Sequence, residues 1–198
     1  MKIDSFEHEL GSLFEKTRKK ERLSLREILG TLSGKGLFLV LIIITLPFCQ
    51  PIQIPGLSTP FGLLIFILGI RAAFGKGLWL PEFLLKKTIS SKKIERLYRA
   101  WIRVFKKIHF LIHPRLIWLV QNRFVKILNT FVIAILGVLL ALPLPVPFSN
   151  IVSGWAIVLI SLGSLENDGL FVLLGHLLFI ITLFFFAAII FSIQVALN

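Results

Sequence analysis

The sequence predicts an all-α, polytopic membrane protein, and three observations support this fold class. Of the 198 residues, 56% are hydrophobic and the mean hydropathy is +0.89, well above the range of soluble globular domains. The apolar residues gather in long blocks, and the basic residues lie between these blocks. Two of the blocks are interrupted by groups of prolines, which a continuous helix does not tolerate.

The net charge of +12 is explained by where the charges lie. Eight of the 22 Lys and Arg residues fall in residues 1–35, the others lie between Arg71 and Lys126, and none follows Lys126. Basic segments that alternate with apolar blocks follow the positive-inside rule. We therefore expect residues 1–35 and 71–126 to face the cytoplasm and nucleic acid not to be a partner.

The N-terminal region predicts an amphipathic helix over residues 5–30, with one apolar face and a basic remainder. No apolar segment of a signal peptide lies in residues 1–35, so we expect the first apolar block to act as its own insertion signal. The lone cysteine, Cys49, excludes an intrachain disulfide and is expected to pack.

The first apolar block, residues 36–70, is divided by "LPFCQPIQIPGLS", which contains Pro47, Pro51 and Pro55. Each arm of about 13 residues covers ~20 Å as a helix, less than a hydrocarbon core of ~30 Å. Both flanks are basic, so the block enters and leaves on one side. We expect either a re-entrant helical hairpin or two short, tilted helices.

The segment 82–126 has a different character, because apolar and basic side chains alternate at helical spacing between Ile94 and Ile108. This pattern predicts either a helix in the cytoplasmic membrane interface, with its basic face toward anionic headgroups, or a helix packed on the protein's own surface.

A second apolar block, residues 127–165, is broken by "LPLPVPFSN". Residues 170–191 form the clearest membrane-spanning segment.

The two broken blocks align with each other. Leu46-Pro47 matches Leu142-Pro143, and beyond the breaks Gly69 matches Gly163 and Gly75 matches Gly169. We therefore expect a single membrane domain over 1–198 that contains approximate repeats over 5–93 and 94–198. Interrupted hydrophobic segments at corresponding positions of two halves indicate a binding site.

Each break would place a helix N-terminus inside the membrane, where residues such as Ser58 and Asn150 could cap it. Two such N-termini would offer free N–H groups to an anion such as phosphate or carboxylate. The simpler interpretation is that the prolines only turn a short hairpin. The expected ligands are membrane lipids, especially anionic or phosphate-bearing ones.

Four charged residues are further binding candidates. Glu166 and Asp168 could relay protons or pair with Arg71, but "SLENDGL" is also typical of a solvated turn. Arg115 could clamp a phosphate or anchor at the headgroups. His176 is expected to be packed and neutral, with proton relay as the alternative.

No catalytic motif is present, and we expect neither enzymatic activity nor a cofactor. His109 and His113 have the spacing of a metal-binding pair but no neighbouring third ligand, so no metal is expected. Whether the protein forms a homo-oligomer stays open.

The ordered set "PGLSTPFGLLIFILG", "GKGLWLP", "HPRL", "LPLPVPFSN" and "LGSLENDGL" resembles the ExoD family of bacterial membrane proteins, over residues from about 20 to 195. A departure lies at Ile70-Arg71, where the family pattern has a polar Gln, and this weakens a role for Arg71. The family-like positions are Pro55, Gly56, Ser58, Trp79, Leu80, Pro81, Pro114, Arg115, Leu116, Pro143, Asn150, Gly163, Glu166, Asp168 and Gly169.

The resemblance implies a multi-pass protein of the bacterial inner membrane with a role in exopolysaccharide synthesis. Two expectations follow from it. The protein either carries or translocates an anionic lipid-linked intermediate, or it is a non-transporting scaffold or regulator of a polysaccharide synthesis complex.

Overall fold

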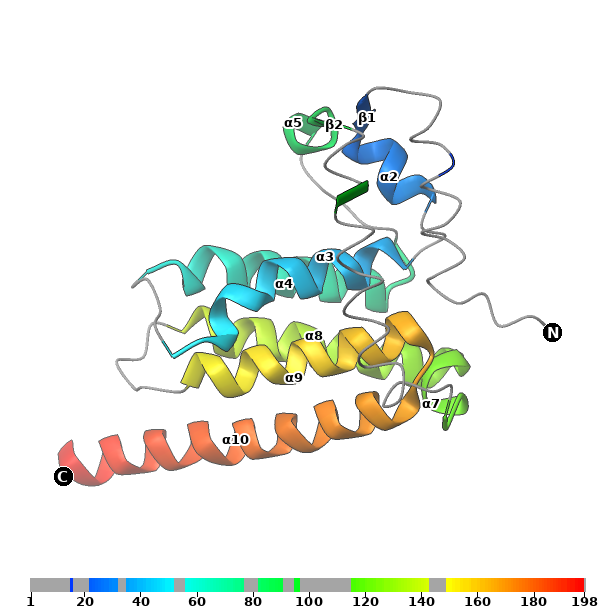
Figure 1. Ribbon diagram of the computed structural model, residues 1–198. Coiled ribbons are helices and arrows are strands. Elements are labelled where there is room, and N and C mark those ends of the chain that lie inside the picture. Colours follow the sequence, from blue (N-terminus) through cyan, green and yellow to red (C-terminus); the bar gives the residue numbers. More distant parts are fainter. Residues whose placement is uncertain are drawn as a thin grey trace.

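The main body of the protein is a bundle of helices that run along one common direction (Figure 1). The computed structural model describes residues 15, 22–31, 35–51, 56–76, 82–90, 95–96, 115–142 and 149–197. The helices of the bundle are α3 (Gly36–Thr45), the 3₁₀ helix η1 (Leu46–Cys49), α4 (Ser58–Ala73), α7 (Trp118–Gln121), α8 (Arg123–Ala141), α9 (Ser149–Glu166) and α10 (Gly169–Leu197).

Three of these helices, α8, α9 and α10, are long and apolar enough to cross a membrane. The span predicted over residues 170–191 is confirmed as a long apolar helix, α10. The first apolar block forms the shorter helices α3 and α4, as expected from its arm lengths. Because α8 and α9 are each long enough to cross, the second block need not form a re-entrant hairpin.

The first proline break begins with a 3₁₀ turn that contains Pro47. The α-helical backbone stops at Thr45, and the chain becomes extended at Gln50. The turn rests on α9, where a Cβ atom on Gly154 would lie 3.2 Å from the Cys49 Sγ atom. The described start of the break is therefore covered by α9. Pro55 and the prolines of the second break lie outside the described residues.

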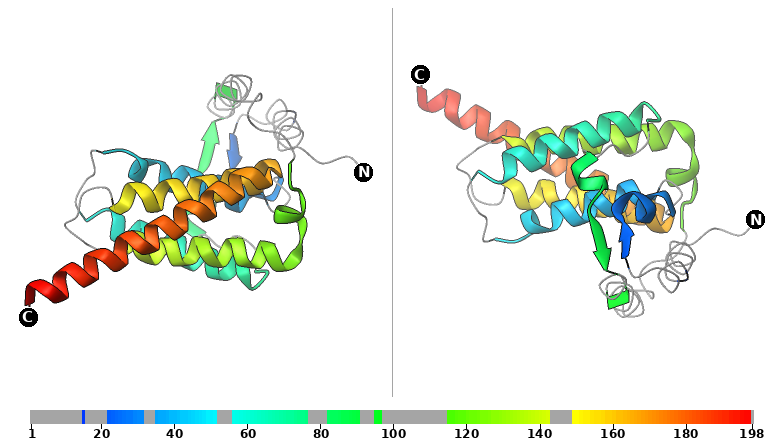
Figure 2. Two further views of the ribbon diagram at one scale, coloured as in Figure 1. Left: turned by 90° about the horizontal axis from the view of Figure 1, so that it is seen from below. Right: turned by 90° about the horizontal axis from the view of Figure 1, so that it is seen from above.

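The helix ends that flank the two proline breaks lie at the same end of the bundle (Figure 1). The points where α3 ends, α4 begins, α8 ends and α9 begins lie at one end of the bundle, which we call the loop end. The opposite end is where α3 and α8 begin, α4 and α9 end, and α10 begins. Helix α4 packs on α8 and α3 packs on α9, while α10 crosses the bundle diagonally against α9 and ends beyond the loop end (Figure 2).

The crossing of α4 and α8 is very close because small residues face each other. A Cβ atom on Gly69 would lie 2.8 Å from the backbone N of Ala134, and one on Gly137 would lie 2.7 Å from the backbone N of Phe66. The Thr59 hydroxyl adds a 3.0 Å hydrogen bond to the Ala141 carbonyl. In lipid, where apolar burial between helices gains little, such close packing and interhelical hydrogen bonds hold helices together.

The helix predicted over residues 5–30 is wrong where the structure describes residues 22–24. These residues form strand β1 (Arg22–Ser24), which pairs antiparallel with β2 (Thr88–Ser90), so the all-α prediction holds only for the rest of the described fold. The physical reason is a capping box that starts helix α2 (Leu25–Thr31) at a new point. Ser24 N donates to Glu27 Oε2 at 2.9 Å, and Glu27 N donates to Ser24 Oγ at 3.2 Å.

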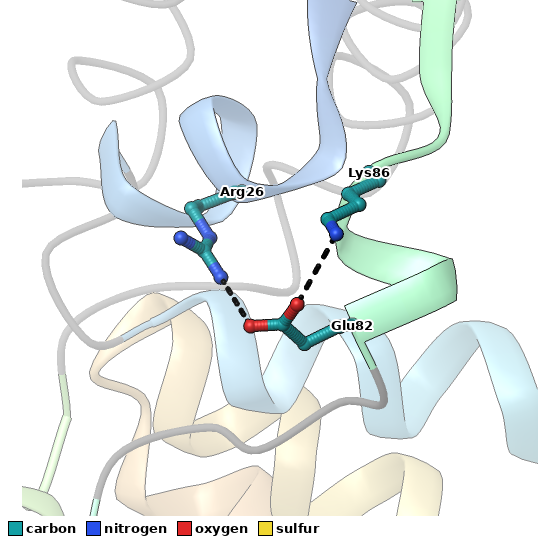
Figure 3. Close-up of polar contacts among 3 residues, drawn as sticks. All are labelled: Arg26, Glu82 and Lys86. Atoms are coloured by element: carbon teal, nitrogen blue, oxygen red, sulfur yellow. Dashed lines mark ion pairs between the residues drawn. The ribbon is translucent and has the colours of Figure 1, made fainter.

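Strands β1 and β2, with α2 and α5 (Glu82–Leu85), form a small module beside the bundle (Figure 1). Glu82 joins its parts through ion pairs of 3.6 Å to Arg26 and 3.3 Å to Lys86 (Figure 3). All three side chains are well exposed, so each pair contributes at most about 1 kcal/mol to stability. The helix predicted between Ile94 and Ile108 falls outside the described residues, except for residues 95–96.

The close crossing of α4 and α8 predicts that a single added methyl group destabilises the fold. We expect Gly137→Ala to lower the free energy of unfolding by about 1–3 kcal/mol, because its Cβ would meet the backbone of α4. Gly30→Ala in α2 is the matched control, since nothing lies within 4 Å of its Cβ and Ala favours a helix by up to about 1 kcal/mol. Thermal unfolding of both variants in one detergent measures the difference, and equal melting temperatures would contradict the close crossing.

Candidate functional site at the cationic end of the bundle

The six predicted site residues lie in two separate groups. Ser58 and Asn150 lie in the first turns of α4 and α9, at the loop end, while the other four lie at the opposite end. Ser58 and Arg71 are thirteen residues apart on one helix, which separates them by about 20 Å. The structure therefore does not bring Arg71 to the helix start at Ser58, and the six residues do not form one site.

The predicted capping of α4 at the loop end is wrong. The N-cap residue is Leu57, which makes no side-chain cap hydrogen bond, and Ser58 already lies within the helix, where it is buried. The neighbouring hydroxyl of Thr59 bonds to α8 instead. In α9, Ser149 is buried and its carbonyl accepts a 3.0 Å hydrogen bond from Ser153, while Asn150 is half-buried.

The opposite end collects positive charge, and we call it the cationic end. Arg71 lies in the last turn of α4, and Arg123 and Lys126 lie in the first turns of α8. Lys35 precedes α3, and Lys76 follows α4. No Lys or Arg occurs in residues 36–70 or after Lys126, so the described part of the loop end carries none. This asymmetry favours contact between the cationic end and anionic headgroups.

A tight turn between α9 and α10 lies at the cationic end. Asn167 adopts a left-handed conformation with φ of 57°, and Asp168 N donates to the Gly163 carbonyl at 2.9 Å. This is the Schellman pattern that ends a helix. Asp168 Oδ1 then accepts a 2.9 Å hydrogen bond from Leu170 N, which caps the start of α10. One short turn thus ends one helix and begins the next.

The turn is present as predicted, but it is not solvated. Glu166 is 8% exposed and Asp168 is 0% exposed. Buried carboxylates are costly unless they are hydrogen-bonded or paired with cations, and Asp168 meets this condition in part through its cap. The two acids thus lie inside the protein, while Arg115 lies at its surface.

The backbone of Arg115 locks the turn in place. Gly169 N donates to the Arg115 carbonyl at 2.7 Å. A Cβ atom on Gly169 would collide with the Leu116 carbonyl oxygen, so only glycine fits. Leu116 itself has a φ of 47°, a conformation that is rare for residues other than glycine and that occurs at functional sites more often than elsewhere. The segments "HPRL" and "LGSLENDGL", far apart in the sequence, therefore meet here.

The segment that follows Arg115 is tied to α8 by two asparagines. Asn122 Oδ1 accepts a 2.9 Å hydrogen bond from Phe124 N and caps α8. Asn129, seven residues or about two turns further, donates from Nδ2 to the Leu119 carbonyl at 2.9 Å. Sequence reasoning did not select either residue, although an Asn before an apolar periodic segment is a recognisable N-cap signal. The site therefore consists of residues 115–121 clamped between α8 and α10.

The described residues contain no group of three or more His, Cys, Asp or Glu side chains that could hold a metal ion. His109 and His113 lie outside the described part of the chain.

The chain matches the family model "Exopolysaccharide synthesis, ExoD" over residues 6–188. It is 33% identical over 168 residues to Protein ExoD of Rhizobium meliloti. This match covers 84% of this chain and 70% of that protein. It is 32% identical over 163 residues to an uncharacterised protein of Synechocystis sp.. This match covers 82% of this chain and 76% of that protein. No solved structure matches the chain.

The role of Asp168 as a helix cap predicts different effects for two substitutions. Asp168→Ala removes the acceptor for Leu170 N and should lower the free energy of unfolding by about 1 kcal/mol. Asp168→Asn keeps an acceptor of the same shape and should stay close to the unchanged protein in thermal unfolding. If Asp168→Asn loses as much stability as Asp168→Ala, the negative charge of Asp168, rather than its cap, holds the turn.

Proposed function

Because this chain belongs to the ExoD family, which is associated with exopolysaccharide synthesis, we propose that it is a multi-pass inner-membrane protein that carries an anionic lipid-linked intermediate in that synthesis. The three long apolar helices support an integral membrane location. The grouping of the cations of the bundle helices and their flanks, Lys35, Arg71, Lys76, Arg115, Arg123 and Lys126, at one end of the bundle supports an anionic ligand or headgroup there.

The observation that carries the proposal is the polar interior of α9. This helix packs against α3, η1, α8 and α10, and its buried residues include Ser149, Ser153, Ser161, Ser164 and Glu166. A helix that only anchors other proteins could fill these positions with apolar side chains. The Ser153 and Ser164 hydroxyls bond to carbonyls of α9 itself, so the helix can bury them at low cost. A row of small polar residues through the centre of the bundle supports a protein that handles a polar ligand.

Arg71 and Arg115 are the residues best placed to receive a phosphate. Arg71 is half-buried in the last turn of α4, and Arg115 is exposed beside the α9–α10 turn. A guanidinium group can bind phosphate oxygens through two parallel hydrogen bonds. The backbone of Arg115 is fixed by its hydrogen bond to Gly169, so its side chain starts from a defined position.

We also propose that the two broken blocks are structural repeats. The first arm of each block, α3 or α8, packs on the second arm of the other, α9 or α4. A two-fold relation between the halves would produce this exchanged pairing. Because both breaks point toward the loop end, such an axis would run along the bundle and not in the membrane plane. The limited length of α3 and α4 is compatible with a re-entrant first hairpin.

A second candidate function is a scaffold or regulator of a polysaccharide synthesis complex. The module of β1, α2, α5 and β2 favours it, because it lies beside the bundle and presents exposed charged side chains. Such a surface suits docking to another protein. The two candidates differ in whether the bundle itself binds a lipid phosphate.

The charge asymmetry predicts a topology that can be measured. On a Cys49→Ser background, Lys76→Cys should react with a membrane-impermeant thiol reagent only from the cytoplasm, because the cationic end should lie inside. Val195→Cys, an exposed position at the other end of α10, should react only from the periplasm. Labelling of both positions from the same side would contradict an odd number of crossings.

The proposed phosphate contact predicts weaker lipid binding in two variants. Arg71→Gln and Arg115→Gln should each weaken the binding of undecaprenyl phosphate by about ten- to hundred-fold, because a charge-assisted hydrogen bond contributes about 1.5–3 kcal/mol. Binding is measured by titration of the purified protein in nanodiscs. Ser58→Ala and Asn150→Ala test the loop end in the same assay.

The matched control is Arg26→Gln, which removes one positive charge from the module beside the bundle. It should leave binding unchanged if the contact is specific. An equal loss in all three arginine variants would indicate only general attraction of the lipid by net charge. If none of the variants changes binding while their melting temperatures fall, the residues are structural and the scaffold function is favoured.

A further inference from the structure

Exposed aromatic side chains gather at the cationic end of the bundle. Phe74, the C-cap residue of α4, is 75% exposed, Trp118 at the start of α7 is 60% exposed, and Phe124 in the first turn of α8 is 83% exposed. Helices α4 and α7 both pack against α8, so the three rings flank the start of one helix. A group of exposed apolar side chains, unlike a single one, marks a contact surface.

The same surface is positively charged. Arg123 and Lys126 are exposed in the first turns of α8, and Lys76 is exposed just after α4. Residues 115–142 contain no acidic residue, and the two acids of the adjacent α9–α10 turn are buried. Exposed cations beside exposed rings are complementary to a partner that combines negative charge with an apolar layer.

The outward face of α8 identifies this partner. Its exposed large apolar side chains form one stripe from the start of the helix to its C-cap, made of Phe124, Ile127, Leu128, Phe131, Val138 and Leu142. Positions 124 and 142 are 18 residues apart, or about 27 Å along a helix. A hydrocarbon core is about 30 Å thick. A stripe of this length fits lipid chains, and its first residue then lies where the hydrocarbon meets the headgroups.

The side chains at this level have the chemistry that the boundary favours. A Trp ring such as that of Trp118 can lie in the apolar layer while its N–H group reaches the polar headgroups. The stems of Arg123 and Lys126 can lie along apolar surface while their charged ends extend to lipid phosphates. Helix α7, which carries Trp118, lies at the cationic end of the bundle (Figure 1).

We propose that the three exposed rings, together with Arg123 and Lys126, anchor the cationic end in the headgroup layer of an anionic lipid leaflet. We call this surface the aromatic anchor. It holds the bundle at a fixed depth, with the rings at the edge of the hydrocarbon and the cations among the headgroups. It does not rest on the lipid-carrying function, because it contacts the bulk lipid of the leaflet and does not include Arg71 or Arg115.

The first test measures the depth of the anchor in a bilayer. Replacement of Trp79, Trp101 and Trp155 by Phe leaves Trp118 as the only tryptophan of the full chain. This protein is reconstituted in vesicles of phosphatidylcholine and phosphatidylglycerol that contain lipids brominated either near the headgroup or near the chain ends. Bromine quenches tryptophan fluorescence only at short range. Trp118 should therefore be quenched more strongly by the shallow bromine than by the deep one.

Helix α8 offers a matched pair of positions. With Trp118→Phe added, Phe124→Trp or Phe131→Trp moves the single tryptophan along the exposed stripe. Phe131 is 48% exposed and lies seven residues, or about 10 Å, further along the helix. Phe124→Trp should be quenched like Trp118, while Phe131→Trp should be quenched more strongly by the deep bromine.

The Phe131→Trp variant also reports whether the bundle has inserted. If it is quenched while Trp118 and the Phe124→Trp variant are not, water or another protein surface covers the rings, and the proposal is wrong. Stronger quenching of Trp118 by the deep bromine, or equal depths for the Phe124→Trp and Phe131→Trp variants, would overturn it as well.

The second test measures the contribution of charge. With bromine on phosphatidylglycerol alone or on phosphatidylcholine alone, quenching of Trp118 reports which lipid is enriched beside it. Phosphatidylglycerol should be enriched, and the double variant Arg123→Gln, Lys126→Gln should lower this enrichment by about fivefold for each charge removed, which corresponds to about 1 kcal/mol. The double variant Lys86→Gln, Lys87→Gln removes two exposed charges from the module beside the bundle and should leave the enrichment unchanged. Equal losses in both double variants would show that enrichment follows net charge and that Arg123 and Lys126 are not part of the anchor.

Discussion

The hydrogen bond from Gly169 N to the Arg115 carbonyl determines the geometry of the cationic end. It joins the segment before α8 to the turn between α9 and α10 at 2.7 Å, and it requires a glycine because a side chain would meet Leu116. The Asp168 cap fixes the direction in which α10 leaves the turn. The position of the Arg115 side chain depends on this contact. A single backbone approach thus positions the proposed phosphate contact.

Packing inside the bundle depends on small and polar residues because lipid offers little hydrophobic driving force between helices. Gly62, Gly69 and Gly137 allow α4 and α8 to approach until backbone meets backbone. The hydroxyls of Thr130, Ser153 and Ser164 bond to carbonyls of their own helices, so these groups are buried without loss of hydrogen bonding. The exposed apolar side chains, in contrast, gather on the outward faces of α8 and α10, where the hydrocarbon chains would cover them.

The sequence predicted those features that depend on local pattern. The uninterrupted apolar run predicted the span of α10, and the alternation of charge with apolar blocks predicted that the cations which flank the bundle helices share one end. The capping box of Ser24 and Glu27 was also readable as S-x-x-E, yet the amphipathic pattern around it led to a continuous helix. The contact between Gly169 and residues 115–116 was not predictable, because neither the separation along the chain nor the positive φ of Leu116 leaves a local signal. Ser58 and Arg71 lie at opposite ends of α4 because thirteen residues of helix separate them by about 20 Å.

The two ends of the bundle therefore have different physical tasks. At the loop end the described chain is uncharged, and its 3₁₀ turn packs against α9 at Gly154. At the cationic end positive side chains lie outside, while two carboxylates and the acceptors of Asn129 and His176 lie inside. The cationic end is therefore suited to contact with anionic headgroups at its surface, while the two carboxylates of the α9–α10 turn are held inside the protein.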